Sequence, residues 1–278
     1  MTSHSHLEIT SATAPGVLRV FNEDSIAIER ELGLLILADG MGGYKAGDVA
    51  SSLATELVLN ELKQKLGKQV VPSLRTVSQL AESSLMVKAA IEKANRFIHK
   101  AAHASDKHRG MGTTIVVILF QDGWATIAHV GDSRLYRLRQ GELTLLTHDH
   151  SLLQEQVELG MISAEEARHS HNRNLVTRAL GVEEDVKVDV LEVDVWPDDI
   201  YLLCSDGLND MVDDADIELA LSELQVNLPL AANHLVEMAN DNGGYDNISV
   251  VIAKLSNGRI ATHGLRDKLF GWLKSLRG

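Results

Sequence analysis

The sequence predicts an α+β layered fold, with largely antiparallel sheets covered by helices. The predicted elements run as strands, two long helices in succession, a group of strands, and then helices and strands mixed. A doubly wound parallel sheet would alternate strand and helix more strictly. Between two strand-like runs, Gln140 and Gly141 are typical of a hairpin turn. With 278 residues, 45% of them apolar, the chain can bury a substantial core.

Seven segments carry the β-branched or apolar runs and flanking turn residues that predict strands. They span residues 33–38, 113–120, 124–130, 134–139, 142–147, 199–205 and 248–255. The run TTIVVILF within them is far too short to span a bilayer. We therefore expect no integral membrane segment.

Two long segments, 47–66 and 78–104, have apolar residues at helical spacing and predict amphipathic helices. Shorter helices are predicted over 215–224 and 229–240, the second with Pro229 in its first turn. Residues 148–181 are polar, charged and poor in strand signals. They predict an excursion from the core.

Composition excludes some classes of protein. The formal net charge of −13 argues against a general nucleic-acid binder, which needs basic surface to neutralise phosphates. The N-terminus has no basic region followed by an apolar one, so a secretory signal is not expected. A single cysteine excludes an internal disulfide and suits a reducing compartment, which favours the cytoplasm.

Acidic residues recur where predicted strands begin or end. Asp39, Asp132 and Asp206 follow apolar runs, and Asp246 directly precedes another. One Asp beside Gly is usually a turn residue that bonds its own backbone. Four aspartates at strand ends are harder to explain as turn residues. Strand ends at one rim of a sheet can lie close together, so these four carboxylates could converge. Converging carboxylates would raise one another's pKa, a cost that divalent cations relieve.

Near the N-terminus, RVFNEDS adds Arg19, Glu23 and Asp24 to these candidates. Oxygen ligands favour Mg²⁺ or Mn²⁺ over zinc. Gly40 allows the backbone to approach closely and lend a carbonyl oxygen. Two bridged metals, roughly 3.5–4 Å apart in such sites, can activate water for in-line displacement at phosphorus. Arg19 suits phosphate oxygens, although a surface ion pair is an equally good reading.

Together these residues resemble the metal-dependent PP2C (PPM) family of protein serine/threonine phosphatases. Seven motifs in the family's order, over about residues 17–255, carry the resemblance: RVFNEDS, LADGMGGYKAGDVAS, GTTIVVILF, AHVGDSRLYRLRQGEL, THDHSLL, LLCSDGLNDMV and GGYDNISVVI. The resemblance implies a four-layer α-β-β-α sandwich. It also implies two Mn²⁺ or Mg²⁺ ions between two central antiparallel sheets.

The resemblance further implies roles for single residues. Asp39 bridges both metals, and Arg19 binds phosphate. Asp132 matches the position of a third, weaker metal. The implied metal ligands are Glu23, Asp24, Asp39, Gly40, Asp132, Asp206 and Asp246.

One position departs from the eukaryotic pattern of the family. Met41 stands where a histidine is the proposed general acid, and methionine cannot donate a proton. The leaving oxygen must therefore be protonated by another group, such as a water on the metal. This methionine form resembles the bacterial branch, whose members commonly oppose Hanks-type Ser/Thr kinases.

The resemblance also sets the expected domain organisation. Residues 1–262 are expected to form the phosphatase domain, in which 148–181 match the variable flap beside the active site. Residues 263–278 form a tail with basic residues between apolar ones at helical spacing. The tail fits a membrane surface, an acidic partner or the protein's own domain, and we favour the last.

We predict a phosphatase that hydrolyses phosphoserine and phosphothreonine by direct attack of a hydroxide held between two divalent metals. Its expected partners are phosphoproteins, including a Ser/Thr kinase. The alternatives are a dedicated regulatory-switch phosphatase and a phosphoprotein-binding pseudophosphatase. Cys204 does not suggest a cysteine phosphatase, because C-x5-R is absent and Asp210 occupies the arginine position.

Overall fold

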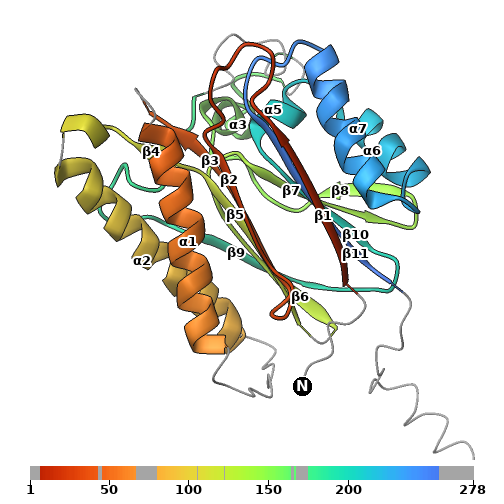
Figure 1. The fold of residues 1–278 in the computed structure, drawn as a ribbon, viewed down its shortest axis with the longest axis horizontal. Coiled ribbons are helices and arrows are strands. Elements are labelled where there is room, and N and C mark those ends of the chain that lie inside the picture. The colour runs from red at the N-terminus through yellow and green to blue at the C-terminus, as the bar shows by residue number, and fades with distance from the viewer. Residues whose placement is uncertain are drawn as a thin grey trace, which may run out of the picture.

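The computed structural model describes residues 7–42, 46–66, 80–104, 106–121, 123–163, 166 and 175–256. Two antiparallel sheets form the centre, and helices cover their outer faces (Figure 1). The predicted α-β-β-α sandwich is therefore confirmed. None of the helices within the described ranges is long and apolar enough to cross a membrane.

The first sheet has the strand order β2-β3-β5-β6-β9, with β4 paired to β3. Its strands are β2 (Asp24–Glu29), β3 (Leu34–Met41), β4 (Gly112–Thr113), β5 (Ile115–Gln121), β6 (Trp124–Val130) and β9 (Asp189–Asp194). Helices α1 (Ala46–Leu66) and α2 (Glu82–Ala104) cover its outer face and share an apolar cluster with it. A 3₁₀ turn, η1 (Asp106–His108), follows α2.

The second sheet has the order β1-β11-β10-β7-β8. Its strands are β1 (Leu7–Ala14), β7 (Arg134–Arg139), β8 (Glu142–Leu145), β10 (Ile200–Cys204) and β11 (Ile248–Leu255). Helices α6 (Asp214–Glu223) and α7 (Leu228–Asp241) cover it. Two short helices, α3 (Leu152–Glu158) and α5 (Asp206–Asn209), lie outside these layers.

The inner faces of the sheets meet in a third apolar cluster. Leu35 and Ile118 from the first sheet pack with Tyr201 and Leu203 from the second, and all four are fully buried. Phe120 meets Tyr201 edge to face, with ring centroids 5.2 Å apart. This core fixes the relative position of the two sheets and hence of the residues at their ends.

Most predicted elements are confirmed to within a few residues. The hairpin turn is confirmed as well, because Gln140 and Gly141 both have positive φ, as a type I′ turn requires. Strands β1, β2 and β9 were not predicted. All three are edge strands whose residues are partly exposed, so their sequences lack the continuous apolar runs of the central strands. Part of the predicted excursion forms α3, Glu166 is helical as well, and Val176 and Leu180 form isolated bridges.

We predict that Ile118→Ala lowers the free energy of unfolding by about 2–5 kcal/mol, because it leaves a cavity between the sheets. Urea unfolding measures this change. Leu159→Ala is the control, since Leu159 is 71% exposed and its truncation should cost within about 0.5 kcal/mol. Equal effects of the two substitutions would contradict the role given to the inter-sheet core.

Candidate active site

The predicted acidic residues converge where one end of the first sheet meets one end of the second. Asp24 and Asp39 are direct cross-strand partners on β2 and β3. Asp206 follows β10, and Asp246 precedes β11, its neighbour in the second sheet. A hydrogen bond from Ser205 Oγ to Asp24 Oδ2, 2.9 Å long, joins the two sheets at this point.

The carboxyl groups lie close enough to perturb one another. Burial raises the pKa of Asp39 well above its ordinary value, and the charges of Asp24, Asp206, Asp132 and Asp246 raise it further. Burial likewise raises the pKa of Asp206, with added repulsion from Asp132 and Asp246. Residues from both sheets therefore share one electrostatic site.

Burial also raises the pKa of three further carboxyl groups. Burial raises the pKa of Asp24 to about 6, although Ser249 and Ser205 partly offset the effect by hydrogen bonding. Burial, with repulsion from Asp149, raises the pKa of Asp132 to about 7. Burial also raises the pKa of Glu23, despite the opposing charge of Arg19.

Two oxygens in this cluster have no hydrogen-bond partner. Among the described residues, Asp24 Oδ1 and Asp206 Oδ1 are buried side-chain atoms without one. Buried polar groups are normally satisfied, so an unpartnered carboxylate oxygen calls for an additional ligand. Several carboxylates with spare oxygen lone pairs form a donor set that fits hard divalent cations.

A close backbone contact holds Glu23 beside Asp39. The Gly40 amide donates to the Glu23 carbonyl at 3.2 Å. A Cβ atom at Gly40 would lie within 2.6 Å of that carbonyl oxygen and closer still to the carbonyl oxygen of Gly47. Gly40 therefore allows β3 and α1 to pack closely, and any side chain there would push α1 away from β3. The Gly40 carbonyl as a metal ligand stays a prediction.

Three polar residues that position the cluster were not predicted. Asn247 Oδ1 accepts from the Glu23 amide at 2.8 Å, and its Nδ2 donates to two backbone carbonyls of the preceding loop. Thr114 Oγ1 accepts from the Asp39 amide at 3.0 Å, and Ser205 makes the bond between the sheets. Asn247 adjoins Asp246 in the YDNIS motif, the one sequence signal that pointed to it.

The structure confirms the ion pair that was one of the two predicted roles of Arg19, and phosphate binding stays a prediction. Its Nη2 lies 2.7 Å from Asp246 Oδ2, so it forms an ion pair. Its partner, however, is a member of the cluster, and the Arg19 side chain is 52% exposed. The guanidinium is therefore held at the mouth of the acidic site.

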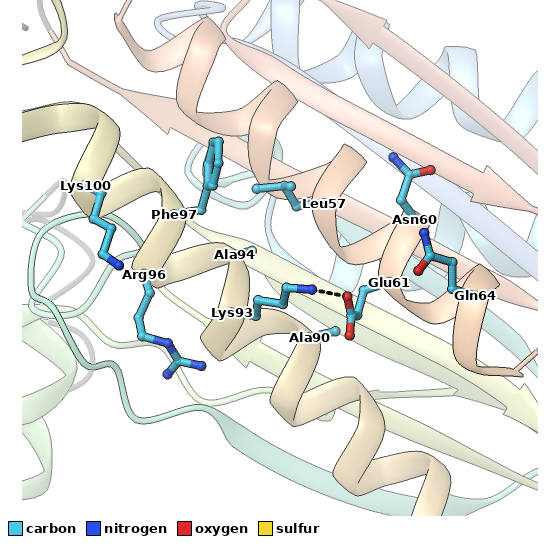
Figure 2. A pocket seen from close by; sticks show the side chains of 10 residues that line it. All are labelled: Leu57, Asn60, Glu61, Gln64, Ala90, Lys93, Ala94, Arg96, Phe97 and Lys100. Atoms are coloured by element: carbon cyan, nitrogen blue, oxygen red, sulfur yellow. Dashed lines mark hydrogen bonds and ion pairs between the residues drawn. The ribbon is translucent and has the colours of Figure 1, made fainter. Parts of the chain in front are cut away.

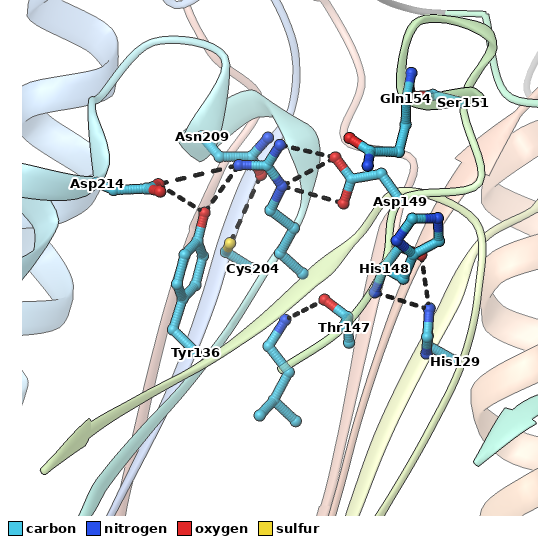
Figure 3. A network of polar contacts seen from close by, with 12 residues as sticks. His129, Tyr136, Thr147, His148, Asp149, Ser151, Gln154, Cys204, Asn209 and Asp214 are labelled. Carbon is cyan, nitrogen blue, oxygen red and sulfur yellow. Dashed lines mark hydrogen bonds and ion pairs between the residues drawn. The ribbon is translucent and has the colours of Figure 1, made fainter. Parts of the chain in front are cut away.

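A polar network beside the cluster joins β7 to the start of segment 148–181 (Figure 3). Arg134 Nε donates a bifurcated hydrogen bond to both carboxylate oxygens of Asp149, and Arg134 Nη2 donates a second bond of 2.7 Å. Arg134 also donates to the Tyr136 hydroxyl, which donates to Asp214 at the start of α6. Asp149 is thus fixed where its charge acts on Asp132.

His129 and His150 form a second group of possible metal ligands with Asp189. The two rings are stacked, with centroids 4.8 Å apart. Arg178 Nη1 lies 2.7 Å from His150 Nε2 and 3.3 Å from Asp189 Oδ1. The guanidinium supplies the positive charge in this group, which we therefore read as a structural anchor.

Cys204 is confirmed as a core residue. It is fully buried in β10, and burial raises the pKa of its thiol to about 12. A nucleophilic cysteine needs a lowered pKa and access to substrate.

The fold and the site define a class: a four-layer sandwich protein with a carboxylate-rich centre at one end of its paired sheets. The sequence pattern of the family described as protein phosphatase 2C matches residues 19–238, and the chain belongs to this family.

Relatives and solved structures agree with this assignment. The serine/threonine phosphatase stp of Listeria monocytogenes is 36% identical over 245 residues, which are 87% of this chain and 93% of that protein. The S. agalactiae serine/threonine phosphatase structure has a TM-score of 0.79 and 35% identity, covering 90% of this chain and 100% of its own. The catalytic domain of PstP in complex with two manganese ions has a TM-score of 0.74 and 36% identity, covering 90% and 99%.

We predict that the metal-free protein loses stability as pH rises. Asp24 and Asp132 have folded pKa values of about 6 and about 7, above their ordinary value of 3.8. Between the unfolded and the folded pKa of each group, the folded state binds more protons than the unfolded state. The free energy of unfolding therefore falls as pH increases through this range. The urea midpoint of chelator-treated protein should therefore be higher near about pH 5 than near about pH 7.5. Saturating Mn²⁺ should remove this trend, and a trend that persists unchanged with Mn²⁺ would argue against a cation site.

Proposed function

We propose that this protein is a metal-dependent phosphatase that hydrolyses phosphoserine and phosphothreonine in proteins. The observation that carries the proposal is the buried cluster of carboxylates from both sheets, in which Asp24 Oδ1 and Asp206 Oδ1 have no partner. Support comes from membership of the protein phosphatase 2C family and from relatives named serine/threonine phosphatases.

Each acidic residue has a proposed part in holding two Mn²⁺ or Mg²⁺ ions. Asp39 would contribute to both ions, Glu23 and the Gly40 carbonyl would help hold one, and Asp206 and Asp246 would help hold the other. Asp24 would act through water, and Asp132 would serve a third, weaker ion. The cluster's raised pKa values and the two manganese ions of PstP support this assignment.

Bound divalent cations would supply a nucleophile from water near neutral pH and withdraw charge from phosphate. The chain's own residues supply orientation and charge. Arg19 presents a planar, always-charged guanidinium suited to two phosphate oxygens, and its bond to Asp246 limits the directions in which it can point.

Met41 ends β3 opposite Gly112 and has no side-chain proton to give. The leaving serine or threonine oxygen therefore takes its proton from a different group. This distinguishes the site from one with histidine at that position.

The wider setting is also proposed. Residues 1–262 form the phosphatase domain, with 148–181 as its flap and 263–278 as a tail. A cytoplasmic location suits the single buried thiol. A Ser/Thr kinase is the proposed opposing partner, since such a kinase adds the phosphate that this enzyme would remove. A pseudophosphatase is disfavoured because every proposed acidic ligand is present.

Asp39→Asn and Asp206→Asn are each expected to lower Mn²⁺-dependent hydrolysis of a phosphothreonine peptide by at least about a hundredfold, since metal ligands contribute several kcal/mol to such reactions. Asp185→Asn is the matched control, because the Asp185 side chain is 89% exposed and outside the cluster. Wild-type rates in either cluster variant would refute the proposed metal centre. Hydrolysis of several unrelated phosphopeptides would argue against a dedicated switch phosphatase.

Arg19→Ala is expected to raise the KM for the phosphopeptide by about tenfold or more, because a charge-assisted, two-point contact with phosphate is lost. Arg19→Lys should recover part of the affinity, since lysine keeps the charge without the planar fork. Steady-state kinetics at saturating Mn²⁺ provides the measurement. An unchanged kcat/KM in the alanine variant would contradict phosphate binding by Arg19. Its role would then be limited to the ion pair with Asp246.

A further inference from the structure

The two helical layers each have a groove on the outside of the molecule. The larger, about 390 Å³, lies between α1 and α2 (Figure 2). Leu57 and Phe97 provide apolar lining there, while Lys93, Arg96 and Lys100 make its α2 side basic. The smaller, about 250 Å³, lies between α6 and α7 and has the opposite charge.

The α6–α7 groove has an apolar floor and an acidic rim. On α7, Leu230, His234 and Met238 are four residues apart and share one face. Leu219 and Leu230 are 55% and 51% exposed, so both offer apolar surface to a partner. The full lining is Asp216, Leu219, Ala220, Glu223, Leu224, Leu230, His234 and Met238. No lysine or arginine is among these described residues.

The segment after Ser256 has matching chemistry. It lies outside the described residues, and its sequence NGRIATHGLRDKLFGWLKSLRG holds five lysine or arginine residues against one acid. Its large apolar residues recur at helical spacing: Leu265, Leu269, Trp272, Leu273 and Leu276. The pattern predicts a helix with an apolar face flanked by cations, which complements an apolar groove flanked by acids.

The described chain also ends beside this groove. Lys254 Nζ donates to the Gln225 carbonyl at 2.9 Å, and Gln225 directly follows Leu224, which lines the groove. Strand β11 packs against α7. The stretch between Ser256 and Leu265 can span up to about 30 Å when extended, which is ample to reach α6 and α7.

We propose that residues 264–278 bind as an amphipathic helix in the α6–α7 groove of their own chain. Their leucine and tryptophan side chains cover Leu219 and Leu230, and their cations face Asp216 and Glu223. The α1–α2 groove fits this segment less well. Its lining residue Glu61 is already paired with Lys93, and Arg96 and Lys100 would repel the cations of the segment.

Contact between Trp272 and the groove provides the test. Leu230→Cys in the full chain, labelled with a bimane fluorophore, reports contact with tryptophan by quenching. Cys204 is fully buried, so the introduced thiol takes the label. We expect strong quenching that Trp272→Phe removes. Phe97→Cys, 52% exposed in the other groove, is the matched control, and its emission should not respond to Trp272→Phe.

Charge reversal checks the electrostatic part of the proposal. Asp216→Lys with Glu223→Lys should relieve the quenching at position 230, as should raised salt, because both weaken attraction between exposed charges. Lys93→Glu with Arg96→Glu should leave it unchanged.

Three results would overturn the proposal. The first is emission at position 230 that does not depend on Trp272. The second is quenching that grows with protein concentration, which would place the segment of a second copy in the groove. The third is quenching at position 97 relieved by Trp272→Phe, which would place the segment between α1 and α2.

Discussion

Mutual repulsion among buried carboxylates is the constraint around which this structure is organised. Asp24 and Asp39 come from one sheet, Asp206 and Asp246 from the other, and burial with shared negative charge raises the pKa of Asp24, Asp39 and Asp206. The apolar cluster between the sheets opposes this repulsion, because it holds both sheets in place. The stability of the core is thus used to maintain a site that is itself unfavourable without a counter-charge.

The ends of the strands are fixed by polar contacts as well as by the core. Asn247 ties the loop carrying Glu23 to the start of β11, and Ser205 connects the two sheets through Asp24. Gly40 and Gly47 allow α1 to begin directly against the end of β3. The positions of the carboxylates therefore depend more on these backbone contacts than on side-chain rotamers. This suits a site that must bind ions in a fixed geometry.

The sequence was informative where local signals and tertiary structure agree. Trp124–Val130 and Ile248–Leu255 are largely buried strands with continuous β-forming runs, and their bounds were predicted correctly. The bounds of the partly buried strand Arg134–Arg139 were predicted correctly as well. The edge strand β1 was missed because LEITSATA alternates small polar residues with apolar ones. Convergence of these acids followed from their repeated position at the ends of predicted strands. The contributions of Asn247, Ser205 and Asp149 did not, because each depends on contacts between residues far apart in the chain.

The hairpin at Gln140 and Gly141 has a consequence for how this protein can vary. Strand β7 separates that turn from Asp132 by roughly 20 Å, since each strand residue advances the chain by about 3.3 Å. Both turn residues take left-handed backbone conformations, so the hairpin closes without help from the carboxylate end of the sandwich. That turn is therefore a natural attachment point, where an appended peptide or an inserted module lies a strand's length away from the chemistry.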